Sequence, residues 1–96
     1  MAEFMNQKRT QPLDPFLNMG RPIPMLRRQI AYEHCQEMGC DSATSWECVN
    51  GVAEMLERDK PYEAMAAGMV YLDLTGTYRI MAVLLTGPTT DKETSP

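Results

Sequence analysis

The segment His34–Cys48, HCQEMGCDSATSWEC, holds all three cysteines of the chain together with its only histidine and its only tryptophan. Gly39 is the kind of residue that ends a helix, because glycine enters the left-handed conformation without a steric penalty. Asp41, Ser42 and Thr44 are all residue types that cap the start of a helix. The segment therefore predicts an elbow between two helices, the second of which starts near Asp41 or Ser42.

The residues before the elbow predict a helix over Met25–Met38. Pro24 suits the start of this helix, where a missing N–H costs nothing. Apolar residues recur at the helical period on one side, and polar residues lie opposite. The side expected to be buried comprises Ile23, Leu26, Ile30, Ala31, His34, Cys35 and Met38.

The residues after the elbow predict a second helix that ends before Pro61. Gly51 lies inside this helix, where a glycine costs about 1 kcal/mol relative to alanine. We therefore expect another element to pack closely against Gly51. The apolar stripe of the helix comprises Trp46, Val49, Val52, Ala53 and Leu56.

Pro61 opens a third predicted helix, PYEAMAAGMVYLDL, with Asp59 as its expected cap. One side of this helix comprises Tyr62, Met65, Ala66, Met69 and Val70. The other side is built mainly from small residues and comprises Ala64, Ala67, Gly68 and Tyr71. A helix that is apolar on both sides is normally buried on both sides. Such burial is difficult in so small a domain, so the pattern predicts a larger protein partner or a homo-oligomer.

The last apolar stretch, TYRIMAVLL (77–85), is followed by Gly87 and Pro88. Its Met, Ala and Leu residues favour a fourth helix. The alternative is a β-hairpin over 71–85, although Thr-Gly is a weak hairpin turn. The sequence therefore predicts an all-α bundle of three to four short helices, with an α+β fold as the alternative.

The N-terminal residues 1–24 contain four prolines, which predict an extended arm rather than a helix. Residues 25–87 are expected to form the helical domain, and residues 88–96 a polar tail. The arm carries the apolar residues Leu13, Phe16, Leu17 and Ile23. We expect these side chains to be held by the domain or by a neighbouring protein.

The charge and hydropathy of the chain disfavour nucleic-acid binding and a membrane span. Thirteen acidic residues against nine basic ones leave a net charge of −4, which disfavours nucleic-acid binding through phosphate contacts. The longest apolar run, IMAVLL, is too short to span a membrane. The N-terminus lacks the apolar segment of an export signal, and the number of cysteines is odd. We therefore expect a cytoplasmic protein with free thiols.

The thiols admit three interpretations. If Gly39 ends the first helix in a Schellman motif, Cys35 and Cys40 occupy the two positions that such a motif brings together. Cys35 and Cys40 then either pack as structural thiols or form a redox pair. A disulfide between Cys40 and Cys48 is the other pairing that would make a redox switch. A zinc site with His34 fits poorly, because His34 and Cys35 point about 100° apart on a helix. We expect neither a bound metal nor another cofactor.

No nucleophile and base occur in a recognisable catalytic motif. The preferred hypothesis is a non-enzymatic protein–protein interaction module, such as an accessory subunit, an adaptor or a small inhibitor. The alternatives are a thiol-based redox regulator that uses Cys35 and Cys40, and a small metal-binding module. The residues expected to bind a partner are Leu13, Phe16, Leu17, Ile23, Tyr62, Met65, Met69 and Tyr71.

Overall fold

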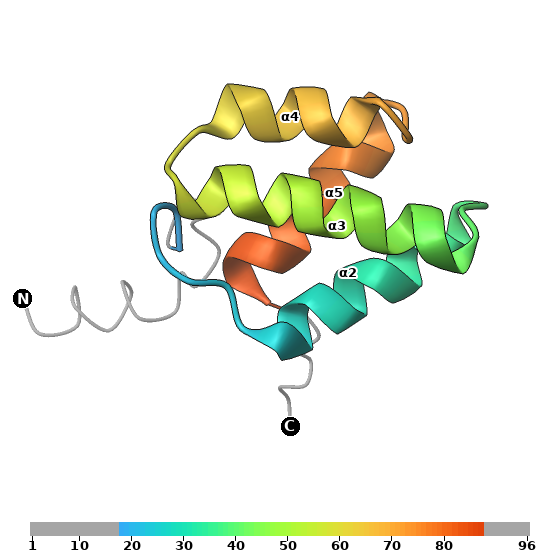
Figure 1. The fold of residues 1–96 in the computed structure, drawn as a ribbon, viewed down its shortest axis with the longest axis horizontal. Helices are drawn as coiled ribbons and strands as arrows, with labels where there is room; N and C mark the ends of the chain where they lie inside the picture. Colours follow the sequence, from blue (N-terminus) through green and yellow to red (C-terminus); the bar gives the residue numbers. More distant parts are fainter. Residues whose placement is uncertain (1–17, 88–96) are drawn as a thin grey trace, which may run out of the picture.

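A computed structural model of the chain describes residues 18–87. The helices in this range are α2 (Met25–Glu37), α3 (Ser42–Glu57), α4 (Pro61–Met69) and α5 (Leu74–Thr86). Figure 1 shows α3 between α2 and α4, with α5 crossing behind it. The predicted all-α fold is confirmed. The alternative hairpin over 71–85 is wrong, because most of that stretch belongs to α5.

The elbow between α2 and α3 has the predicted backbone geometry. Gly39 adopts a φ of 104°. The N–H of Cys40 donates to the carbonyl of Cys35 at 3.1 Å, and the N–H of Gly39 donates to that of Gln36 at 3.0 Å. These two hydrogen bonds define the Schellman motif. They confirm that Gly39 ends the helix, with Cys35 and Cys40 at the expected positions of the motif.

Aspartate side chains cap two of the helices. Asp41 Oδ1 accepts a hydrogen bond from the N–H of Thr44 at 2.8 Å, which confirms the predicted start of α3. Asp73 Oδ1 accepts one from the N–H of Gly76 at 2.7 Å. Because Asp73 acts as a cap, α5 begins at Leu74 rather than near residue 77, where the sequence pattern placed its start.

Asp59 has a different role from the one expected. The N-cap of α4 is Lys60, while Asp59 adopts a φ of 62°. The N–H of Asp59 donates to the carbonyl of Leu56 at 3.0 Å, and that of Lys60 donates to Met55 at 2.9 Å. Asp59 therefore ends α3 in a second Schellman motif, because its short polar side chain tolerates the left-handed conformation. The prediction that it caps α4 is wrong.

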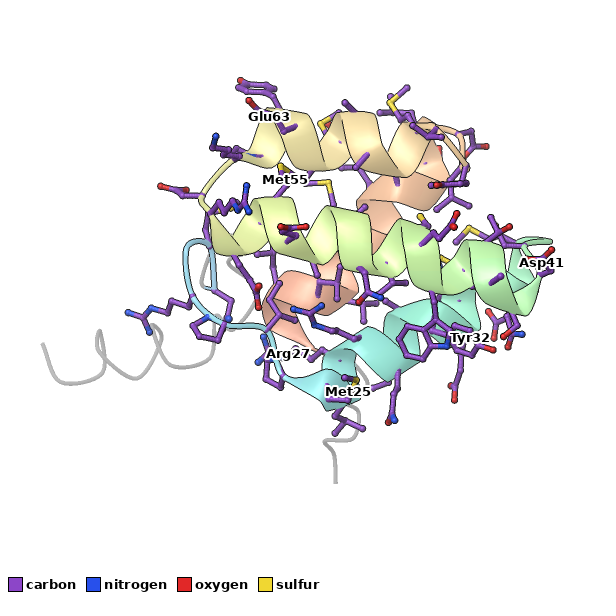
Figure 2. All side chains as sticks on the ribbon, viewed as in Figure 1. Met25, Arg27, Tyr32, Asp41, Met55 and Glu63 are labelled. Carbon is purple, nitrogen blue, oxygen red and sulfur yellow. The ribbon has the colours of Figure 1, made fainter. Side chains whose placement is uncertain are left out.

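The small residues of α4 form the contact with its neighbours. Ala64 and Gly68 are buried. A Cβ added to Gly68 would lie 2.6 Å from Cγ2 of Thr77 on α5. A Cβ added to Gly51 of α3 would lie 3.7 Å from Cβ of Ala67, an ordinary contact distance. The α4–α5 contact is therefore tighter than the α3–α4 contact. Figure 2 shows Met55 between α3 and α4.

The buried stripe of α2 is rotated relative to the expected one. Ala31 and Cys35 are fully buried, but Leu26 is 63% exposed. Arg27 takes the inward position instead, where its Nη1 donates to the carbonyl of Leu85 at 3.1 Å. Figure 2 labels Arg27 on this part of α2. The guanidinium thus satisfies carbonyl groups at the end of α5, and this turns Leu26 outward.

Residues 18–24 pack against α3 rather than standing apart from the domain. The N–H of Gly20 donates to the carbonyl of Leu56 at 2.9 Å. Glu57 Oε2 accepts from the N–H of Ile23 at 2.7 Å and from Arg28 Nη2 at 2.9 Å. Ile23 is only 5% exposed and belongs to the core. Its expected role as a partner-binding residue is therefore corrected, because the chain's own core already covers it.

Alanine substitutions of Gly51 and Gly68 are expected to change the free energy of unfolding in opposite directions. Gly68→Ala is expected to lower the free energy of unfolding by about 1–3 kcal/mol, because its Cβ overlaps Thr77. Gly51→Ala is expected to raise it by up to ~1 kcal/mol, because the space exists and alanine favours the helix. Urea unfolding followed by circular dichroism measures both. Gly68→Ala combined with Thr77→Ala should recover part of the loss; a Gly68→Ala variant as stable as the wild type would contradict the described contact.

The position of Glu57 generates a second prediction. Glu57→Ala removes the acceptor for Ile23 and Arg28, so we expect the free energy of unfolding to fall by about 2 kcal/mol. Glu54→Ala on the same helix is the matched control. It breaks only the exposed pair with Arg58, which is worth less than ~1 kcal/mol. Equal losses in the two variants would show that Glu57 does not anchor residues 18–24.

Candidate protein-binding site

The solvent-facing side of α4 is apolar. Tyr62 is 82% exposed, Val70 71% and Met69 48%, and Ala66 between them is also exposed. These four residues recur at helical spacing and lie on one side of the helix; we call them the α4 face. Glu63 flanks the α4 face, and Figure 2 labels it on this outer helix.

The sequence predicted burial on both sides of this helix, and residues 18–87 provide it on one side only. The small-residue side, with Ala64 and Gly68, packs against α3 and α5. Met65 lies at the margin, half-buried against the core. The α4 face has no cover from residues 18–87, because no helix of that range lies on the outer side of α4 (Figure 1).

Beyond the end of α4, the surface continues as an open hollow beside Tyr71. The hollow has a volume of about 310 Å³. The Tyr71 hydroxyl donates to Glu47 Oε1 at 3.2 Å, and this hydrogen bond raises the pKa of Tyr71. Tyr71 as a whole is 39% exposed. The hollow is lined by Met38, Tyr71, Leu72 and Asp73.

Five of the eight residues expected to bind a partner lie within the described range. Tyr62, Met69 and Tyr71 are exposed, Met65 is half-buried, and Ile23 lies in the core. The other three, Leu13, Phe16 and Leu17, lie outside the described residues.

Some exposed apolar residues were missing from that expected set. The sequence could have identified Val70 and Ala66 as neighbours of Tyr62 on the helix surface, because they follow it at intervals of four residues. Leu74 and Tyr78 of α5 are 46% and 53% exposed. The sequence pattern did not identify them, because the predicted start of α5 was near residue 77 instead of Leu74.

Two of the three thiols are buried at the seam between α2 and α3. Cys35 and Cys48 are both 0% exposed, whereas Cys40 is partly exposed. The hydrogen bond to Cys48, together with burial, raises the pKa of Cys35. The thiol that most raises the pKa of Cys35 therefore belongs to Cys48, rather than to the expected redox partner Cys40. Since the thiolate is the reactive form, Cys35 is held in its unreactive state.

The carboxylate beside His34 is already paired with an arginine. Its Nδ1 lies 3.7 Å from Glu37 Oε1, and the same carboxylate oxygen pairs with Arg79 Nη2 at 3.1 Å. Within residues 18–87, no group of three or more His, Cys, Asp or Glu side chains is placed to hold a metal ion.

The helices of this range are also too short or too polar to cross a bilayer. Comparison with protein-family models, curated proteins and solved structures found no match to the chain.

The burial of the thiols leads to a chemical prediction. In the folded chain at pH 8, we expect Cys40 to react first with an aromatic disulfide reagent, and Cys35 and Cys48 to react only on unfolding. Release of the coloured thiolate measures the rate. Cys40→Ser is the control and should leave no rapidly reacting thiol. Comparable rates for all three thiols, or a Cys35–Cys40 disulfide formed by dilute peroxide without unfolding, would contradict this arrangement.

Proposed function

We propose that the chain is a non-enzymatic protein–protein interaction module, such as an accessory subunit, an adaptor or a small inhibitor, that binds protein through the α4 face. The observation that carries the proposal is the exposure of Tyr62 and Val70 at 82% and 71%. Contiguous apolar residues on the surface of a small protein typically mark an interaction site.

The energetics of the α4 face support this proposal. Burying a valine side chain contributes about 1.5–3 kcal/mol, so Val70 alone gives a partner a substantial gain. Tyrosine is enriched among the residues that dominate binding energy, because its ring is large and its hydroxyl can still reach water. Met69 adds a flexible side chain that adapts to irregular surfaces. Glu63 and Lys60 flank these residues as polar groups at the rim.

The buried thiols support a structural role more than a redox one. A redox regulator that uses Cys35 and Cys40 needs an accessible thiolate at one of the two positions. Cys35 is completely buried, and burial also raises the pKa of Cys40. We therefore keep the interaction module as the single proposed function.

The test compares two variants with the same change of charge. Tyr62→Glu/Val70→Glu places carboxylates on the α4 face, and Gln29→Glu/Gln36→Glu places them at exposed positions of α2. Both variants should retain the wild-type helical content and unfolding temperature, checked by circular dichroism. Each is then immobilised and exposed to extract from the native source. We expect the proteins retained by the wild type to be retained by the α2 variant and reduced at least tenfold with the α4 variant.

Equal retention by the two variants would show that binding does not use the α4 face. Retention of no protein by the wild type, together with a monomeric state at high concentration, would contradict the proposed function itself.

A further inference from the structure

We infer that Met38 forms a redox-sensitive contact between the end of α2 and the first turn of α5, which a peroxide opens by oxidising its thioether to the sulfoxide. This inference does not depend on the proposed function, because it concerns the packing of α2 against α5 rather than the α4 face.

The thioether of Met38 lies directly against the backbone of α5. Met38 is the C-cap residue of α2, and its side chain packs against the core. A Cβ added to Gly76 would lie only 2.9 Å from Met38 Sδ. Gly76 is buried in the first turn of α5, so the absence of a side chain there leaves the space that the sulfur atom occupies. There is no room for a further atom between the sulfur and the helix.

The same sulfur atom belongs to a side chain that a small oxidant can reach. Met38 is partly exposed, and it lines the open hollow of about 310 Å³ beside Tyr71. Hydrogen peroxide is only slightly larger than water, which takes up about 30 Å³ in the liquid. The hollow therefore admits peroxide to Met38. Access of this kind is denied to Met81 of α5, which is only 6% exposed.

The reaction transfers one oxygen atom from the peroxide to the side chain. Met38 Sδ attacks a peroxide oxygen, the O–O bond breaks and an S–O bond forms. The thioether is oxidised to the sulfoxide, and hydrogen peroxide is reduced to water. The product is polar, and methionine sulfoxide reductases convert it back to the thioether.

The new oxygen atom weakens the contact in two ways. It makes an apolar side chain polar, which favours withdrawal of that side chain from the core into water. It also places a partial negative charge near the carboxylate that caps α5. Asp73 Oδ1 would lie 3.2 Å from the same added Cβ on Gly76, so this oxygen and Met38 Sδ are neighbours. Repulsion between the two oxygens opposes the hydrogen bond that Asp73 accepts from the N–H of Gly76.

Peroxide treatment of matched variants tests the inference in the full chain. The background is Cys40→Ser, which removes the partly exposed thiol. Met38→Leu keeps an apolar side chain of similar volume, a change that cores usually tolerate, and cannot be oxidised. Met69→Leu is the matched control, because it removes a thioether that is 48% exposed on α4. Each protein is treated with dilute hydrogen peroxide, and peptide mass spectrometry measures the oxidation of each methionine.

Thermal unfolding, followed by circular dichroism before and after treatment, gives the first result. We expect oxidation to lower the unfolding temperature of the background and of Met69→Leu by about 4–8 °C, a modest loss of stability for a domain of this size. Met38→Leu should change by less than about 2 °C. Incubation with methionine sulfoxide reductases of both epimer specificities should restore the original temperature.

Amide hydrogen exchange in the background protein locates the change without the leucine variant. The N–H groups of Gly76 and Thr77 donate to the side chain and the carbonyl of Asp73. We expect both to exchange about tenfold faster after oxidation, because the first turn of α5 opens more often. The amides of Val52 and Ala53 in α3 should be affected less.

Three results would overturn the inference. An equal loss of stability in Met38→Leu would assign the effect to another methionine. Complete oxidation of Met38 with no change in unfolding temperature or exchange would show that the contact tolerates the sulfoxide. Resistance of Met38 to peroxide under conditions that fully oxidise Met69 would show that the hollow does not give access to the sulfur atom.

Discussion

The contact between Gly68 of α4 and Thr77 of α5 determines how the outer helix sits on the bundle. No side chain larger than hydrogen fits at position 68, since a Cβ there would overlap Thr77. Helices approach this closely only through small residues, and Ala64, one turn earlier, extends the same contact. Once this side of α4 faces inward, helical geometry directs Tyr62, Ala66 and Val70 outward. The apolar α4 face is therefore a direct consequence of how α4 is held.

The seam between α2 and α3 depends on a different set of groups. Cys35 and Cys48 fill its interior, where a free thiol packs as a small apolar side chain. At its edge, the rings of Tyr32 and Trp46 stack with their centroids 4.4 Å apart and their planes inclined by 17°; Figure 2 labels Tyr32 there. The cysteines are best understood as part of the packing of this seam.

The exposure of the α4 face reflects a general constraint on small proteins. A short chain cannot cover every apolar helix face, because its surface is large relative to its volume. Within residues 18–87, the small-residue side of α4 packs against α3 and α5, and Tyr62 and Val70 on the other side are exposed. The proposed function uses these exposed side chains.

The sequence by itself determined three of the helix boundaries. Gly39, Asp41 and Pro61 act through hydrogen bonds and backbone angles within about five residues, so their effects were predictable. The tertiary structure alone decided which sides of the helices are covered. It placed Arg27 instead of Leu26 against the end of α5, drew Ile23 into the core, and left Tyr62 exposed. These outcomes depend on volumes and unpaired carbonyl groups contributed by residues far apart in the chain, and periodicity within one helix contains no information about them.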